Sequence, residues 1–175
     1  QSDLAIDPAG TLYLLYQDGQ FSTVRGSPPI LWLARSADAG ATWGGQVRAD
    51  AKTASGCAAS ACYALFPEVT AGAAGSVTVA WMDDRNGSPI DHLNGWNVWL
   101  RSSTNGGASF GASQQISAYD AAQAQSRPNG FVFPYGDYFG LEVNGCGSPM
   151  LTWGEGLDWA GGSSSPGHIE FRSLC

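Results

Sequence analysis

A twelve-residue segment occurs twice in the chain, and this repeat constrains the fold more than any other feature. Residues 33–44 read LARSADAGATWG, and residues 100–111 read LRSSTNGGASFG. The copies align without a gap and share the pairs Leu33/Leu100, Ser36/Ser103, Gly40/Gly107, Ala41/Ala108 and Gly44/Gly111. Self-similarity at a long fixed period is typical of repeat architectures, in which each copy belongs to one supersecondary unit. The chain is therefore expected to build its fold from repeated units.

Each copy has the pattern of an apolar strand that runs into a turn closed by an aromatic residue. Asp38 in the first copy and Asn105 in the second can hydrogen-bond to their own backbone two residues on. Glycine supplies a positive φ, and the aromatic ring packs the turn onto its hairpin. We expect a structural role for the whole set, which comprises Ser36, Asp38, Gly40, Thr42, Trp43, Ser103, Asn105, Gly107, Ser109 and Phe110.

The repeat continues outside these turns. Three segments align on a glycine six residues before an aromatic, namely 10–16, 75–81 and 147–153. Each is an apolar strand after a glycine-bearing turn, which is the signal for a hairpin. A strand precedes each turn, at 4–6, 69–71 and 141–143, and a third strand follows, at 30–36, 96–103 and 168–173. A fourth strand follows in two units only, near 46–49 and 113–117.

These units predict an all-β chain that forms a partial β-propeller of about three four-stranded antiparallel blades. Blade one covers about residues 2–50, blade two about 65–118, and blade three about 136–175, without its outer strand. Propellers have about 4–8 blades, so three blades cannot close a ring. An open stack would leave apolar faces in water. Either the chain is a fragment of a longer protein, or a partner chain supplies further blades.

The first repeat copy fits the pattern Ser-x-Asp-x-Gly-x-Thr-Trp, and here the chain resembles the Asp-box (BNR) repeats of sialidase-like β-propellers. The second copy, with Asn105 and Phe110, is a degenerate version. The resemblance implies a ring of about six blades. It also implies the sialidase set of an arginine triad, a Tyr/Glu nucleophile pair and an acid/base Asp.

The sialidase motif Phe/Tyr-Arg-Ile-Pro, which carries the first arginine of that triad, is absent from the sequence. Arg25, Arg85 and Arg127 lie in long loops, and their spacing assigns no triad. Asp-box propellers also include proteins that bind or assemble without catalysis, so the fold alone does not set the function. We therefore favour the interpretation that the chain by itself is not catalytic.

Composition excludes several classes of partner. The formal net charge is −7 and the chain holds one lysine, Lys52. Nucleic acids and anionic membranes are bound through clustered Lys and Arg, so neither is expected as a partner. No apolar run approaches the roughly 18–20 residues of a membrane span.

The four cysteines favour disulfide bonds. An even count in a chain rich in Gly and poor in Lys is typical of proteins from oxidising compartments, so a secreted, extracellular or periplasmic location is expected. We predict a Cys57–Cys62 bond within a small loop and a Cys146–Cys175 bond across the final hairpin. Free thiols or a zinc site are the alternatives, but the Cys-x4-Cys spacing matches zinc sites poorly.

The long connections fall on one face of the predicted propeller, where binding residues usually lie. Asp83, Asp84 and Arg85 follow the second strand of blade two, and Asp18 and Glu155 hold matching positions in the other blades. Paired carboxylates suit glycoside hydrolysis, as acid and as base or nucleophile. The alternative, favoured because the acid recurs in every blade, is that these acids bond turn backbones and that Arg85 neutralises one of them.

A second group of candidates lies in segment 133–140, which has no counterpart in the other blades. Tyr135, Asp137 and Tyr138 offer hydroxyls, a carboxylate and aromatic faces, which suit sugar recognition. Blade packing with a buried tyrosine hydroxyl is the alternative. The candidate catalytic residues are Asp83, Asp84, Asp137, Tyr135 and Glu155, and the candidate ligand-binding residues are Tyr135, Asp137, Tyr138, Arg85 and Trp159.

No cofactor is expected, and no metal site can be assigned. Asp83, Asp84 and Asp91 could supply oxygen ligands to a structural calcium ion, but their spacing matches no calcium-binding loop. Three functions therefore remain open. The chain is a propeller portion that binds glycan or protein, half of a glycoside hydrolase completed elsewhere, or a building block that self-associates into a ring or filament.

Overall fold

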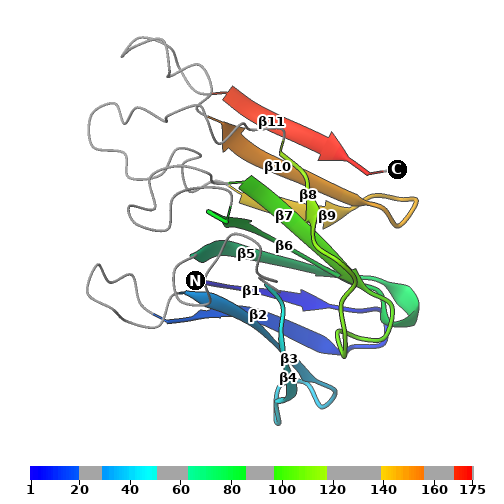
Figure 1. Cartoon of the computed structure of the whole chain (residues 1–175). Helices are drawn as coiled ribbons and strands as arrows, with labels where there is room; N and C mark the ends of the chain where they lie inside the picture. Colours follow the sequence, from blue (N-terminus) through cyan, green and yellow to red (C-terminus); the bar gives the residue numbers. More distant parts are fainter. Residues whose placement is uncertain (20–28, 51–62, 86–96, 118–138, 156–167, 175) are drawn as a thin grey trace.

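The computed structural model describes residues 1–19, 29–50, 63–85, 97–117, 139–155 and 168–174. These residues form three antiparallel sheets (Figure 1). Blade one contains β1 (Ser2–Ile6), β2 (Leu12–Asp18), β3 (Ile30–Ser36) and β4 (Gly44–Arg48). Blade two contains β5 (Ala64–Ala71), the 3-10 turn η1 (Ala73–Gly75), β6 (Val77–Asp83), β7 (Asn97–Ser103) and β8 (Gln114–Gln115). Blade three contains β9 (Phe139–Val143), β10 (Pro149–Glu155) and β11 (His168–Ser173).

The predicted fold class is confirmed. Within each sheet, strands that follow one another in the chain are hydrogen-bonded neighbours, as in a propeller blade. The third sheet has three strands among the described residues, and the sheets do not close into a ring. The only helical element in the described ranges is η1, and none there is long and apolar enough to cross a membrane.

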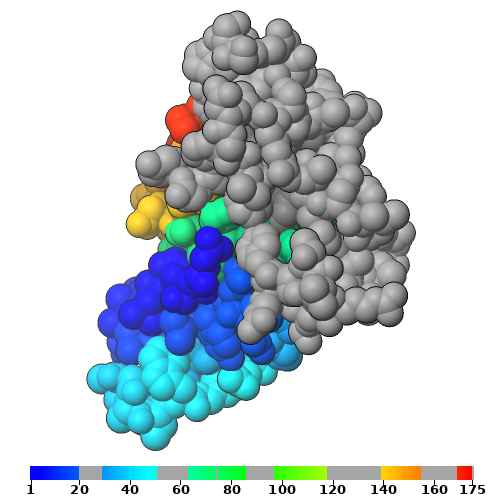
Figure 2. All heavy atoms as spheres, turned by 90° about the vertical axis from the view of Figure 1, so that its left-hand side faces the viewer, coloured from blue at the N-terminus to red at the C-terminus, as the bar shows by residue number. Residues whose placement is uncertain are grey.

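The three blades are stacked in chain order. Strand β5 contacts both β1 and β9, so the first strands of the three blades lie side by side. Figure 2 shows blade one, coloured blue to cyan, at one end of the stack, with parts of blades two and three beyond it. This order makes blade two the middle layer.

Two apolar cores lie between the blades. The core between blades one and two includes Leu15, Leu33, Val79 and Trp81. The core between blades two and three is formed by another set, which includes Met82, Leu100, Leu141, Leu151 and Trp153. Because successive side chains of a strand point to opposite faces, blade two supplies one set of residues to each core. All seven residues of β6 are consequently buried.

The second repeated turn packs directly on blade one. Gly107 has φ of +73°, and a Cβ atom there would lie 2.4 Å from Cδ2 of Leu33. Both the backbone conformation and the close approach therefore favour glycine.

Candidate functional site

The acids predicted to recur by blade do lie at matching places. Asp18, Asp83 and Glu155 are the last residues of β2, β6 and β10, whose ends lie at the same edge of the stack (Figure 1). Asp18 is exposed, and its Oδ1 accepts a hydrogen bond from the Gly19 N–H at 2.9 Å. In the sequence, the long connections 18–29, 83–95 and 155–167 begin at these three residues.

Asp83 is fully buried and is held by three kinds of donor. Its Oδ2 accepts a hydrogen bond from the indole N–H of Trp81 at 2.7 Å. The Nε of Arg85 lies 2.9 Å from both carboxylate oxygens, and the Arg85 backbone N–H donates to Oδ1 at 3.2 Å. A buried carboxylate is tolerated when it is paired and hydrogen-bonded in this way. The geometry is that of a scaffold contact.

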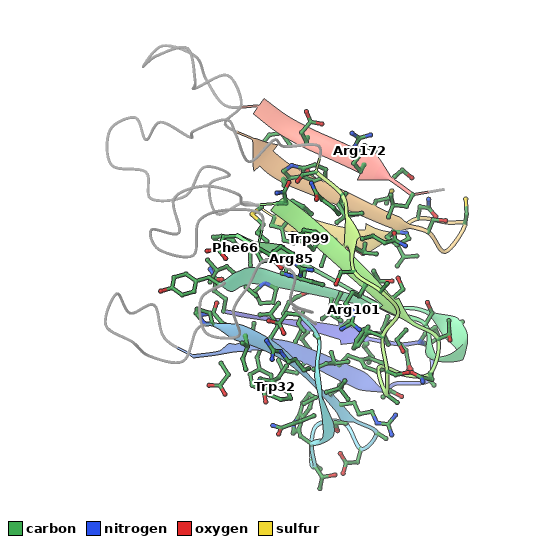
Figure 3. The ribbon with its side chains drawn as sticks, in the orientation of Figure 1. Trp32, Phe66, Arg85, Trp99, Arg101 and Arg172 are labelled. Carbon is green, nitrogen blue, oxygen red and sulfur yellow. The ribbon has the colours of Figure 1, made fainter. Side chains whose placement is uncertain are left out.

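Two tryptophans stack against Arg85. Its guanidinium lies 3.8 Å from the centroid of the Trp99 ring and 5.8 Å from that of Trp81 (Figure 3). Arginine suits this position because its planar cation can stack on an aromatic face while it bonds to a carboxylate. Only 14% of the Arg85 side chain is exposed. Arg85 therefore neutralises Asp83, which is one of the two pairings that the alternative interpretation allowed.

The carboxylate of Asp84 is also hydrogen-bonded within the protein. The residue is buried, and its Oδ1 accepts a hydrogen bond from the Tyr63 backbone N–H at 2.8 Å. This bond links the end of β6 to the residue just before β5. Neither Asp83 nor Asp84 thus presents a carboxylate dyad that is open to a substrate.

A second polar cluster connects blades one and two. Arg101 donates from Nε to the Gly111 carbonyl at 2.7 Å, and from Nη1 to the Ala49 carbonyl at 2.8 Å. Arg48 pairs with the buried carboxylate of Asp50 at 2.8 Å. Burial lowers the pKa of the Arg101 guanidinium, while Asp50 opposes this change. Arg101 thus fastens the outer part of blade two to the end of blade one.

The two repeated turns use the same hydrogen bonds. Ser36 donates to Asp38 at 2.7 Å, and the Gly40 N–H donates to the Ser36 hydroxyl at 2.9 Å. In the second turn, Ser103 donates to Asn105 at 2.8 Å, and the Gly107 N–H donates to Ser103 at 3.0 Å. These contacts fit the structural role that we expected for both turns.

Asp38 and Asn105 each accept a hydrogen bond from the backbone N–H four residues on, which belongs to Thr42 at 2.9 Å and to Ser109 at 3.0 Å. The carboxylate of Asp38 also accepts a hydrogen bond from the Thr42 hydroxyl at 2.6 Å. The bonds from Thr42 and Ser36 lower the pKa of Asp38 to about 2. In the second turn, the amide of Asn105 instead donates to the Ser109 hydroxyl at 2.8 Å.

A group of acids on the first strands was missed by the sequence reasoning. Glu68 on β5 faces Asp3 on β1 and Glu142 on β9. Burial, and then the charge of Asp3, raise the pKa of Glu68 to about 7. The charge of Glu142 also raises this pKa, whereas a hydrogen bond from the Leu141 backbone N–H lowers it. A carboxyl group that titrates near neutrality is suited to acid–base work. The available signal was that Asp3 and Glu68 share a repeat position, 65 residues apart.

A backbone irregularity lies beside this group. Phe66 has φ of +53°, and the pairing of β5 with β6 shifts register between Leu65 and Glu68. The Phe66 N–H donates to the side-chain oxygen of Gln1 at 2.8 Å. Bulges often redirect side chains near functional sites, and a non-glycine residue with positive φ is uncommon. No sequence feature that we used predicted it.

Several predicted residues lie outside the described ranges, namely Tyr135, Asp137, Tyr138, Trp159, Asp91, Cys57, Cys62 and Cys175. The structure gives the backbone of Glu155, opposite His168, but does not describe its side chain. Cys146 lies in the exposed turn between β9 and β10, and the Leu174 N–H donates to the Pro149 carbonyl at 3.0 Å. Among the described residues, no three His, Cys, Asp or Glu side chains are grouped so as to hold a metal ion.

Comparison with known proteins shows the fold. No family model matches the chain, and no curated protein matches it in sequence. A Hadza microbial sialidase matches 98% of the chain with a TM-score of 0.64 and 14% identity. An alpha-L-arabinanase from Penicillium chrysogenum, complexed with arabinobiose, matches 94% with a TM-score of 0.56 and 16% identity. The Trypanosoma rangeli sialidase in complex with the inhibitor DANA matches 98% with a TM-score of 0.57 and 12% identity.

The matched part is a minority of each larger protein. The chain spans 34% of the Hadza sialidase, 41% of the arabinanase and 28% of the Trypanosoma sialidase. At these identities the similarity concerns the fold and not the site residues. Over nearly its whole length, the chain thus shares the β-propeller fold of sialidases and arabinanases.

Proposed function

We propose that this chain is a non-catalytic portion of a secreted, extracellular or periplasmic β-propeller that binds a glycan or a protein through its long-loop face. Further blades, from a partner chain or from the rest of a longer protein, complete the ring. The observation that carries the proposal is that protein groups already bind the carboxylates of Asp83 and Asp84. Both carboxylates are buried and bonded to protein donors, in a scaffold that resembles sugar-processing enzymes.

In this proposal, the buried acids support the loop face instead of reacting with a ligand. Asp83 and Arg85 hold the base of the connection after β6, because each neutralises the other and Arg85 stacks on Trp99. The ligand contacts then come from aromatic residues that offer an apolar face and a hydrogen-bonding group. We assign this part to Tyr135, Tyr138 and Trp159, with Asp137 as an acceptor for sugar hydroxyls.

The test is a glycan array probed with the intact chain and with the variants Tyr135→Ala and Trp159→Ala. We expect both variants to lose binding by tenfold or more, since truncating an aromatic hot spot costs about 2 kcal/mol or more and a tenfold loss is about 1.4 kcal/mol. Trp43→Ala is the matched control, because Trp43 is an exposed aromatic of a repeated turn, away from the long-loop face. Binding that is unchanged in both test variants contradicts the glycan assignment.

Glycoside hydrolysis is the second candidate, and Glu68 is the observation that favours it. Its pKa of about 7 would allow the carboxyl group to donate a proton at neutral pH. The test is hydrolysis of a panel of sialosides and aryl glycosides by the assembled protein. Activity that vanishes in Glu68→Gln or Asp137→Asn favours the enzyme, and an inactive panel supports the binding module.

A further inference from the structure

The outward face of blade three is built like an interior face. Phe171 pairs with Thr152 on this face, just as Leu33 pairs with Leu15 in blade one and Leu100 with Ala80 in blade two. Leu33 and Leu100 are buried against the next blade, whereas Phe171 is 61% exposed. Large apolar side chains that recur at a buried repeat position indicate a partner surface.

A neighbouring position on β11 repeats the pattern. Ile169 corresponds to Leu31 and Val98, which are fully buried, yet Ile169 is 67% exposed. Blades one and two thus use these two positions to pack against the blade that follows them. Blade three carries the same kind of residues and has no follower among the described residues. Its open face therefore fits another blade.

The outward face of blade one is built like a face that packs on a preceding blade. Leu4 on β1 corresponds to Val69 on β5 and to Leu141 on β9, both of which are buried against the preceding blade. Leu4 itself is 55% exposed. The chain therefore carries one open face that lacks a following blade and one that lacks a preceding blade.

Backbone hydrogen bonding differs between the two existing junctions and the open face of blade three. The carboxylate of Asp3 accepts from the Val69 N–H of blade two, and that of Glu68 accepts from the Leu141 N–H of blade three. The next position in this series is Gly140, which offers no carboxylate. A blade that follows blade three therefore receives no such acceptor from this position.

Blade one needs no such acceptor. The equivalent N–H belongs to Leu4, and it donates to Oδ1 of Asp3 in its own strand at 2.8 Å. Blade one can thus follow blade three without leaving an unpaired N–H at the junction, which would cost about 1–3 kcal/mol if buried. The two open faces match in apolar character, and the Leu4 N–H already has an acceptor in its own strand.

We infer that a second copy of this chain is the partner, with blade one of each copy packed on blade three of the other. The two identical junctions close a ring of six blades with two-fold symmetry and cover all four open faces. This inference rests on the proposed function only in that further blades complete the propeller. It names their source.

The test begins with the mass of the chain in solution, measured by light scattering over a wide concentration range. We expect twice the 18.2 kDa of one chain. The variants Phe171→Asp and Leu4→Asp should each weaken the dimer by roughly a hundredfold or more, because each change enters both junctions. Arg172→Ser is the control, since this exposed residue adjoins Phe171 on the opposite side of β11, and it should stay dimeric.

Mixing the two variants tests which faces meet. The mixture of Phe171→Asp and Leu4→Asp retains one intact junction, so it should form a mixed dimer that neither variant forms alone. A dimer that survives Leu4→Asp would mean that blade three packs on blade three and would overturn the assignment. A wild-type chain that stays monomeric, or one that grows into open-ended assemblies, would overturn the closed ring. Because the substituted residues are exposed in the single chain, circular dichroism should show unchanged β structure.

The same samples separate this inference from the proposed function. A monomer that binds glycan rejects the two-copy ring and keeps the binding module. A dimer that binds no ligand on the array supports the ring and counts against the binding module.

Discussion

The carboxylate of Asp3 on β1 accepts a hydrogen bond from the backbone N–H of Val69 on β5 at 2.8 Å, across the boundary between blades one and two. One repeat later, Glu68 accepts from the Leu141 N–H of blade three. The same carboxylate–backbone link therefore joins each described blade to the next. It satisfies a strand-edge N–H that the sheet itself leaves unpaired.

Removing this link should destabilise the junction between blades one and two. Asp3→Ala leaves the Val69 N–H without its acceptor, so we expect the free energy of unfolding to fall by about 1–3 kcal/mol. Asp3→Asn keeps an acceptor oxygen and should lose less. Urea unfolding curves measure both values, and equal losses for the two variants would show that the charge, not the hydrogen bond, matters.

Glu68 should make the stability depend on pH. Its folded pKa of about 7 exceeds the ordinary value of 4.5, so the folded state binds a proton more tightly than the unfolded chain does. This contribution is fully present below about pH 4.5 and is lost as the pH rises through about 7. Thermal melts between these pH values should show a melting temperature that falls with rising pH in wild type and changes less in Glu68→Gln.

A neighbouring acid provides the control for that experiment. Glu142 is exposed, and its charge raises the pKa of Glu68. Glu142→Gln should therefore shift the loss of stability to lower pH without abolishing it. Parallel pH profiles for wild type and Glu68→Gln would contradict the assignment of the titration to Glu68.

The buried pair of Asp83 and Arg85 should tolerate little change. Asp83→Ala leaves a mostly buried guanidinium unpaired and removes the acceptor of the Trp81 indole, which predicts a loss of about 3–5 kcal/mol. Arg85→Lys should also destabilise, because an ammonium group cannot both bridge the two oxygens and stack on Trp99. Chemical denaturation followed by tryptophan fluorescence measures both, and a wild-type midpoint for Arg85→Lys would exclude the stacking role.

The second repeated turn offers a test of packing between blades. Gly107→Ala introduces a methyl group within 2.4 Å of Leu33 at a positive φ, so we expect a loss of about 2–4 kcal/mol from strain and overpacking. Gly44→Ala serves as the control, since a Cβ there meets nothing within 4 Å. Similar melting temperatures for the two variants would mean that the turn moves away from blade one without cost.

Both predicted disulfides can be tested by intact mass spectrometry of the unreduced and the reduced protein. We expect the unreduced mass to be lower by two hydrogens for each bond, and peptide mapping to recover Cys57–Cys62 and Cys146–Cys175. The proximity of Leu174 to Pro149, three residues after Cys146, is compatible with the second bond. A fully reduced mass after purification in air would reject both bonds.

The strands and the turns were predictable from local sequence. The spans 30–36 and 168–173 agree with β3 and β11, and the described residues of the third blade form the three strands that we expected there. These features depend on alternation along one strand and on turn residues a few positions apart, which a sequence displays directly. The pairing of Arg85 with one of the two preceding acids was also predictable as an alternative, because Asp83, Asp84 and Arg85 follow one another in the sequence.

The contacts between blades were decided by the tertiary structure. The stacking of Arg85 on Trp99, the link from Asp3 to Val69 and the pKa of Glu68 all join residues from different strands or blades. Such contacts depend on how the sheets stack and on which groups are removed from water, and neither is set by the spacing of residues along the chain. The sequence by itself determined the blades and their order, while only the packing of blade on blade decided which acids are bound, which one titrates near neutrality and which faces remain open.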